Sequence, residues 1–431
     1  MKLLESVFDL TAHRTSVRAE ATAGLTTFLA MAYITVVNPS ILAETGMDFG
    51  AVFVATCLAA ACGSLVMGLC ANYPIAQAPG MGQNAFFTFS VVIGMGHNWQ
   101  TALGAVFVSG VLFVVLSVLP VREWLVNAIP RDLKLGMAGG IGLFLGFIAL
   151  QNAGIVVDNP ATLVSLGNVL GLGPAICVIG FVVIAALAAR GIPGAVIIGI
   201  LLGTVLGALS GDIEFAGVAA LPPSPAPVLF QLDIASALQW SMVTVILSML
   251  IVDVFDTAGT LVGVASRANL LGENGRLPRL RRALLADSSA TVVGALVGTS
   301  STTSYVESAA GVEAGGRTGL TAVVCGLLFL GCLFFAPLAQ SVPAYATASA
   351  LLFVACLMAR SLAELSWDDL TESAPAVVAA VAMPLSFSIA DGIGLGFICY
   401  ALVKVLSGRA GECPLAVFVV AVVFLLKYAL L

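Results

Sequence analysis

Three carboxylates lie in apolar stretches of this chain. Asp253 and Asp256 interrupt the apolar run 242–265, and Glu307 lies in the second stretch, 301–312. A charged side chain at the centre of a membrane helix costs about 2.5–3.5 kcal/mol even on a mild insertion scale. A chain that keeps three of them is expected to use them in a substrate site or a proton path.

The spacing of the two aspartates suggests what they could do. Asp253 and Asp256 are three positions apart, which places them on one face of a helix. Two close carboxylates in a low dielectric cannot both ionise cheaply, so one is expected to hold a proton at neutral pH. The alternative is a packing role for each acid, with Ser or Thr donors around it. Asp287 is expected to cap a helix locally, and Asp391 to be a loop or N-cap residue.

Two polar segments are expected to break the regular helical pattern. The segment 74–89 begins with Pro, Gln and Gly and becomes apolar at Ala85. It predicts an extended piece followed by a half-helix from about Gln83, whose free N–H groups point into a site. The segment 298–311 has the same character, with hydroxyl groups in place of glycines. The alternative is a glycine-rich packing surface between helices.

The composition predicts an all-α polytopic membrane protein. The 431 residues are 60% hydrophobic and 9% charged, whereas soluble proteins carry about 25% charged residues. The charged stretch 1–19 has no apolar h-region typical of a removable signal peptide. No basic stripe indicates nucleic-acid binding.

The motifs exclude several classes of protein. Nine cysteines form no CxxC pair, and the two histidines lie in a terminus and a loop, so neither a metal site nor a cofactor is expected. A phosphate loop, an HExxH motif and a nucleophile elbow are absent from the sequence. We therefore expect a secondary carrier driven by an ion gradient, and not an enzyme.

Fourteen membrane spans are expected, seven on each side of a Pro-rich external linker at 211–235. An odd number of spans inverts the second copy of a repeat, and inverted repeats are typical of transporters with a site near the midplane. The predicted domains are a cytoplasmic N-terminus (1–19), a first repeat (20–210), a second repeat (236–408) and an interfacial C-terminal helix (409–431). The predicted spans are 20–40, 51–71, 78–95, 101–119, 132–151, 171–189, 193–210, 236–265, 281–298, 302–314, 318–338, 344–360, 374–389 and 391–407.

The basic residues predict the orientation in the membrane. With the N-terminus in the cytoplasm, 16 of the 17 lysines and arginines fall on the cytoplasmic side, as the positive-inside rule requires. The exception is Lys427. A C-terminal helix that lies at the interface would keep this lysine off the outer side.

Four segments together resemble a known family. They are TTFLAMAYITVVNPSIL (26–42), QAPGMGQNAFF (77–87), VDVFDTAGTLVGVA (252–265) and GTSSTTSYVESAAGVEAGGRTG (298–319). The chain resembles the azaguanine-type (AzgA-like) purine permeases of the nucleobase–cation symporter-2 superfamily from about residue 20 to 408. The resemblance implies a 7+7 inverted repeat with a core domain (spans 1–4 and 8–11), a gate domain (spans 5–7 and 12–14) and partly extended spans 3 and 10. It also implies proton symport of guanine, hypoxanthine or adenine across the cytoplasmic (inner) membrane, and a homodimer.

The resemblance also implies roles for individual residues. Asp256 and Glu307 would bind the base, Asn84 would be a polar contributor, and Asp253 with Asp256 would hold the coupling proton. Relatives of the uracil and xanthine branches often carry a second His or Asp four residues after the first acid, where this chain has Thr260. The remaining expected ligand contacts are Phe86 and Phe255, which could stack on a flat base, and Gly82 and Thr303 of the two broken spans.

Two other functions fit the same architecture. An anion carrier for sulfate or bicarbonate would use half-helix N-termini, but three carboxylates beside the site oppose an anion. A channel-like pore is the second alternative, and saturable uptake that a protonophore abolishes would exclude it.

Overall fold

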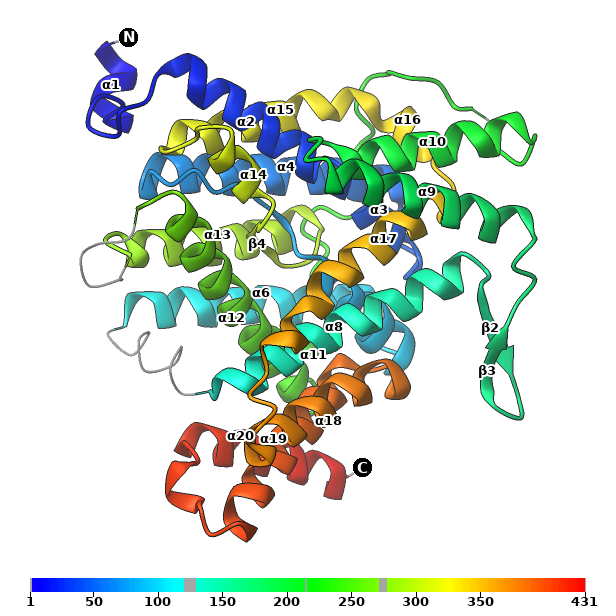
Figure 1. Cartoon of the computed structure of the whole chain (residues 1–431), viewed down its shortest axis with the longest axis vertical. Coiled ribbons are helices and arrows are strands. Elements are labelled where there is room, and N and C mark those ends of the chain that lie inside the picture. The colour runs from blue at the N-terminus through cyan, green and yellow to red at the C-terminus, as the bar shows by residue number, and fades with distance from the viewer. Residues whose placement is uncertain (1, 120–128, 214, 271–276, 431) are drawn as a thin grey trace.

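The structure is a computed structural model that describes residues 2–119, 129–213, 215–270 and 277–430. It is almost wholly helical (Figure 1). Within these residues, nine helices are long and apolar enough to cross a membrane, and three shorter apolar helices accompany them. The chain therefore has the fold of a multi-pass helical membrane protein.

The elements follow in sequence order. The helices are α1 (Lys2–Phe8), α2 (Val17–Met31), α3 (Ile34–Ala43), α4 (Phe49–Val66), α5 (Met81–Ala85), α6 (Trp99–Val118), α8 (Arg131–Asn152), α9 (Leu172–Ala189), α10 (Ala195–Leu209), α11 (Ile234–Ala237), α12 (Val243–Arg267), α13 (Leu280–Val297), α14 (Ser308–Glu313), α15 (Gly319–Cys332), α16 (Ala336–Gln340), α17 (Ala344–Ala359), α18 (Leu370–Ser386), α19 (Ile389–Leu406) and α20 (Leu415–Leu430). Wider or tighter helical turns are η1 (Met67–Ala71), η2 (Phe86–Gly94), η3 (Trp240–Met242), η4 (Leu333–Phe335), η5 (Arg360–Glu364) and η6 (Ala410–Glu412). The strands are β1 (Gln77–Pro79), β2 (Val156–Asn159), β3 (Leu163–Leu166) and β4 (Thr302–Ser304).

Each of the fourteen ranges expected to be a span contains a helical segment. Polar caps define several of the boundaries. Asp48 accepts a hydrogen bond from the Ala51 N–H (2.7 Å) at the start of α4, and Ser388 accepts one from the Asp391 N–H (3.2 Å) at the start of α19. The number of complete crossings and the inverted repeat stay predictions.

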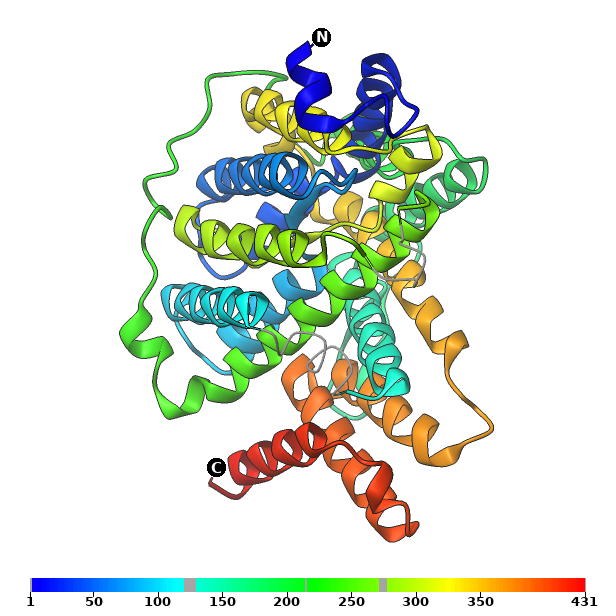
Figure 2. The same cartoon turned by 90° about the vertical axis from the view of Figure 1, so that its left-hand side faces the viewer.

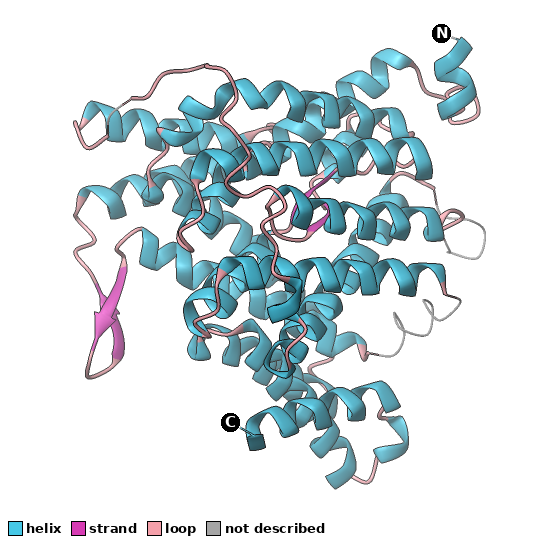
Figure 3. Cartoon of the chain, turned by 180° about the vertical axis from the view of Figure 1, so that it is seen from behind, coloured by secondary structure: helices cyan, strands magenta, loops and turns pink. Residues whose placement is uncertain are grey.

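Two short strands meet inside the helical body. β1 pairs antiparallel with β4, with Ala78 opposite Thr303, and Figure 3 shows this pair between the helices. Each strand precedes a short helix, α5 after β1 and α14 after β4. Extended backbone is therefore present in both segments for which the sequence predicts it, and the strands satisfy each other's backbone groups.

A glycine makes the turn that leads into β4. Gly298 caps α13 with φ +96°, and a Cβ there would lie 2.5 Å from the Cβ of Val228. A left-handed conformation and this close approach both require glycine.

The helices pack in two sets. In the first, α13 lies between α4 and α6, α15 packs on α2 and α4, and α12 packs on α6. In the second, α8 packs on α17 and α18, α9 packs on α10 and α17, and α18 packs on α19. Figure 2 shows α4, α13 and α6 stacked side by side and apart from the long helices α8 and α17. The space between the two sets contains the cavity that carries the candidate site.

The C-terminal helix folds back along its neighbour. Lys427 Nζ lies 2.8 Å from Asp391 Oδ1, which joins the last turn of α20 to the first turn of α19. The lysine that departs from the predicted charge distribution therefore has its own carboxylate partner. A hairpin, β2 paired with β3, follows α8, and it was not predicted from the sequence.

Candidate functional site

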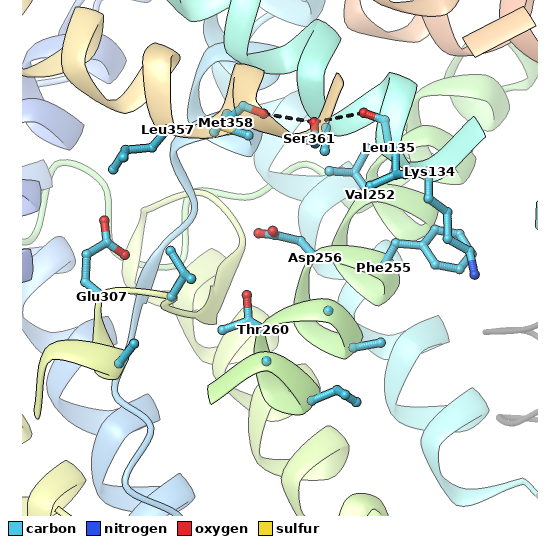
Figure 4. Close-up of a pocket in the computed structure, with 18 of the residues that line it drawn as sticks. Lys134, Leu135, Val252, Phe255, Asp256, Thr260, Glu307, Leu357, Met358 and Ser361 are labelled. Carbon is cyan, nitrogen blue, oxygen red and sulfur yellow. Dashed lines mark hydrogen bonds between the residues drawn. The ribbon is translucent and has the colours of Figure 1, made fainter. Parts of the chain in front are cut away.

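A large cavity separates the two helix sets. It has a volume of about 1910 Å³ and is lined by side chains of α8, α12, α14 and α17, with Gly82 and Gln83 of α5. Ser361 ties two of its walls together, because its hydroxyl donates to the Leu135 carbonyl (3.0 Å) and to the Met358 carbonyl (2.9 Å) (Figure 4).

Asp256 and Glu307 face this cavity from different elements. Asp256 belongs to α12, and Glu307 is the residue directly before α14. Both side chains line the cavity (Figure 4). Among the described residues, Asp256 has no hydrogen-bond or salt-bridge partner, and Glu307 accepts a hydrogen bond from the Tyr33 hydroxyl (2.7 Å). The two carboxylates therefore offer uncommitted acceptor oxygens to a ligand with N–H donors.

Asp253, one turn before Asp256 in α12, does not line the cavity. Its side chain is buried, and its Oδ2 accepts hydrogen bonds from the hydroxyls of Ser301 (2.8 Å) and Thr291 (3.1 Å). Its Oδ1 is buried and has no hydrogen-bond partner in the part of the chain that the structure describes. The two aspartates are three positions apart, yet one opens to the cavity and the other does not.

Asp287 has a different position from the one expected. It lies inside α13, seven residues after the helix begins, so the prediction of a local cap was wrong. Its carboxylate accepts hydrogen bonds from the Thr257 hydroxyl (2.6 Å), the Ser304 hydroxyl (2.6 Å) and the Gln77 amide (3.0 Å). These donors come from α12, β4 and β1, so Asp287 joins both strands to the helix that carries Asp256.

The other expected ligand residues divide into two groups. Gly82 and Phe255 line the cavity with Asp256 and Glu307. The remaining three, namely Asn84, Phe86 and Thr303, are buried and do not line it.

These buried residues belong to the framework around the site. Phe86 is part of the hydrophobic core. Asn84 receives a short hydrogen bond from the Ser300 hydroxyl, and the Thr303 hydroxyl lies 2.9 Å from that of Thr257. Asn84 therefore ties the two strand–helix segments to each other, and Thr303 ties β4 to α12.

The mouth of the cavity carries positive charge. Its basic lining residues are Arg131, Lys134, Arg267, Arg279, Arg281, Arg282 and Arg360. Lys134 Nζ stands 4.8 Å from the centre of the Phe255 ring, a cation–π distance. Exposed ion pairs join Arg131 to Glu364 (3.5 Å) and Arg267 to Glu313 (3.1 Å).

The arrangement offers a ligand both hydrogen-bond acceptors and an aromatic ring. Two acceptor carboxylates, the Gln83 amide and the Phe255 ring share one cavity. Among the described residues, no group of three or more His, Cys, Asp or Glu side chains could hold a metal ion.

Comparison with known proteins identifies the family. Residues 18–395 match the Permease family. The chain belongs to this family. It is therefore a transporter and not an enzyme.

The relatives cover the chain from end to end. The adenine permease AdeP of Escherichia coli (strain K12) is 49% identical over 99% of this chain and 96% of its own length. The guanine/hypoxanthine permease PbuG of Bacillus subtilis (strain 168) is 47% identical over 99% of this chain and 100% of its own length. The resemblance to purine permeases is thereby confirmed.

Solved structures support the fold. The transmembrane domain of a cyanobacterium bicarbonate transporter, BicA, superposes with a TM-score of 0.65 at 16% identity, over 88% of this chain and 97% of that one. SLC26A9 superposes with a TM-score of 0.66 at 10% identity, over 94% of this chain and 69% of that one. At these identities the likeness concerns the fold alone.

Proposed function

We propose that this permease carries purine nucleobases, guanine, hypoxanthine or adenine, across the cytoplasmic membrane together with protons. The observation that carries the proposal is the pair of carboxylates, Asp256 and Glu307, that face one cavity from α12 and α14. Purine bases are flat and neutral and present N–H donors at their edges, which carboxylate oxygens accept. The names of the relatives, adenine permease and guanine/hypoxanthine permease, point to the same substrate class.

Within this proposal Asp256 and Glu307 bind the base, while Phe255 offers a ring against which it can stack. Asn84, Phe86 and Thr303, which do not line the cavity, would act by supporting the segments that do. A purine occupies much less than 1910 Å³, since sites for drug-sized ligands measure about 300–1,000 Å³. Closure of the cavity around the base would therefore accompany transport.

Proton coupling rests on Asp253 and Asp256. Asp256 is open to the cavity and Asp253 is enclosed one turn away, so a proton held by Asp256 would lie beside the bound base and one held by Asp253 would lie one helical turn from it. The bound base is neutral, and the proton would neutralise one carboxylate. The loaded site would therefore hold one charge fewer at membrane depth, which lowers the cost of the crossing. Collapse of uptake by a protonophore is the expected result.

The movement would take place between the two helix sets. The set with α12 and α14 would form the core domain that the resemblance implies, and the set with α8 and α17 would form the gate domain. Displacement of one set against the other would expose the cavity alternately to each side, within a 7+7 inverted repeat. The basic residues at the mouth all belong to the side for which the sequence predicts a cytoplasmic location, which supports an opening to the cytoplasm.

An anion carrier is the second candidate, because the similar solved fold of BicA belongs to a bicarbonate transporter. The two carboxylates in the cavity oppose it, since like charges repel strongly where water is scarce. Uptake inhibited by bicarbonate or sulfate and insensitive to purines would favour the anion carrier.

The test is uptake of radiolabelled hypoxanthine, adenine and guanine by a host that lacks purine transport. We expect saturable uptake of at least one base in cells that express the protein. Asp256→Ala and Glu307→Ala should each reduce uptake strongly, whereas Asp212→Ala, a change in the external linker, should not. Intact uptake in both cavity variants would show that the site assignment is wrong.

A further inference from the structure

We infer that Tyr33 is a positioning residue that fixes the orientation of the Glu307 carboxylate toward the bound base. The inference deepens the proposed function and rests on it. The Tyr33 hydroxyl donates to Glu307 Oε1 at 2.7 Å. The side chain of Tyr33 is only 1% exposed, so water does not compete for this bond.

Tyr33 does not reach the main cavity. It lines a side pocket of about 390 Å³ that adjoins the main cavity and shares Glu307 and six other lining residues with it, but Tyr33 itself is not among the residues that line the main cavity. A base bound between Asp256 and Glu307 would therefore contact Glu307 and not Tyr33. Any effect of Tyr33 on such a base has to pass through the carboxylate.

The hydrogen bond gives the two carboxylate oxygens of Glu307 different roles. Oε1 is held by the phenol, and Oε2 receives no hydrogen bond from any other described residue. Without the phenol, the side chain would rotate about its three torsions and lose entropy each time it bound a base. The hydrogen bond to the phenol instead holds the Oε2 acceptor in one orientation before the base binds, which lowers the entropy cost of binding.

The backbone around Tyr33 is built to make this contact. Tyr33 lies at the interruption between α2 and α3, and α14, which follows Glu307, packs on α2. At Gly311 the approach of the two helices is so close that a Cβ would overlap the Thr27 hydroxyl oxygen. The close contact fixes the distance between the Tyr33 backbone and the Glu307 backbone.

The test compares three phenol deletions in the uptake assay. Tyr33→Phe should raise the KM for the transported base about tenfold, the size expected for a hydrogen bond to a charged group, and leave Vmax almost unchanged. Tyr305→Phe is the near control, because its hydroxyl donates to the Pro79 carbonyl (2.6 Å) and not to Glu307. Tyr400→Phe is the distant control, because its hydroxyl also donates to a carboxylate, that of Glu372 (2.9 Å).

Competition by methylated bases separates positioning from general damage. Hypoxanthine methylated at N1, N7 or N9 can be used as a competitor of uptake. The methylated base should compete poorly when its methyl group replaces the hydrogen that would be donated to Glu307. In Tyr33→Phe and in Glu307→Gln, methylation of that one nitrogen should cost less apparent affinity than in the wild-type protein. The loss of affinity on methylation of the other nitrogens should be unchanged. A fall in Vmax with unchanged KM, an equal rise in KM for Tyr305→Phe, or unchanged methyl penalties would overturn the inference.

A measurement without substrate keeps the two proposals distinguishable. If the wild-type protein takes up no purine, the proposed function fails, but the positioning of Glu307 can still be measured. Modification of Glu307 by a hydrophobic carbodiimide, followed by peptide mass spectrometry, should be faster in Tyr33→Phe than in the wild-type protein or Tyr400→Phe. Equal rates would overturn the inference.

Discussion

Asp287 accounts for a large share of the local stability at the centre of the first helix set. Its carboxylate is fully buried and receives three side-chain hydrogen bonds. Asp287→Ala leaves three buried donors without their acceptor, so we expect the free energy of unfolding to fall by about 3 kcal/mol. Thermal unfolding of the purified protein in detergent should show this as a lower Tm.

The matched control is an exposed aspartate with one partner. Asp212 accepts a hydrogen bond from the Tyr345 hydroxyl (2.9 Å) at the surface, and Asp212→Ala should cost less than about 1 kcal/mol. Asp287→Asn should fall between the two, because the amide keeps one acceptor oxygen. Equal Tm values for Asp287→Ala and Asp212→Ala would contradict the role assigned to Asp287.

For single residues, the sequence identifies the functional candidates better than it identifies their surroundings. Asp253, Asp256 and Glu307 are conspicuous because each interrupts an apolar run. Which of them opens to the cavity depends on the rotation of α12 against α13, and no local pattern encodes that rotation. Asp287 was misassigned for the same reason, because its donors lie at Gln77, Thr257 and Ser304, far away in the sequence.

The elements were more predictable than the site. Apolar runs of the length of a bilayer located a helical segment in all fourteen expected ranges. Pro, Gly and hydroxyl residues indicated extended backbone near 77 and 302, where β1 and β4 lie. The pairing of the two strands joins residues more than two hundred positions apart, so only the tertiary fold determines it.

The contact between α2 and α14 gives a prediction at the scale of elements. A methyl group at Gly311 would overlap the Thr27 hydroxyl and lie 2.7 Å from the Ala23 carbonyl oxygen. Gly311→Ala should therefore move α14 away from α2, at a cost of about 1–3 kcal/mol, and shift Glu307 with it. Uptake assays should show a raised KM and thermal unfolding a lower Tm.

The control for this contact is a helical glycine with open space around it. A Cβ at Gly331 in α15 would meet nothing within 4 Å. Gly331→Ala should keep the KM of the wild-type protein and should not lower the Tm, because alanine favours a helix more than glycine does. A KM that is the same in both variants would show that the close approach does not position Glu307.

For the whole molecule, the decisive question is which side of the membrane the cavity faces. The mouth is lined by basic residues, and the positive-inside rule places such residues in the cytoplasm. The fold alone leaves the direction open, because the predicted inverted repeat would look similar from both sides. Chemical accessibility answers the question directly.

Two engineered cysteines test the direction and the site together. Val306 lines the cavity and is 59% exposed, and Val218, in the linker predicted to be external, is 54% exposed. In a variant whose native cysteines are replaced by serine, a membrane-impermeant thiol reagent should modify Val306→Cys only in inside-out vesicles and Val218→Cys only in right-side-out vesicles. Because Glu307 is the next residue, a bound purine should slow the modification of Val306→Cys and leave that of Val218→Cys unchanged. Modification of both cysteines from the same side would contradict the orientation, and equal rates with and without purine would separate the cavity from the base-binding site.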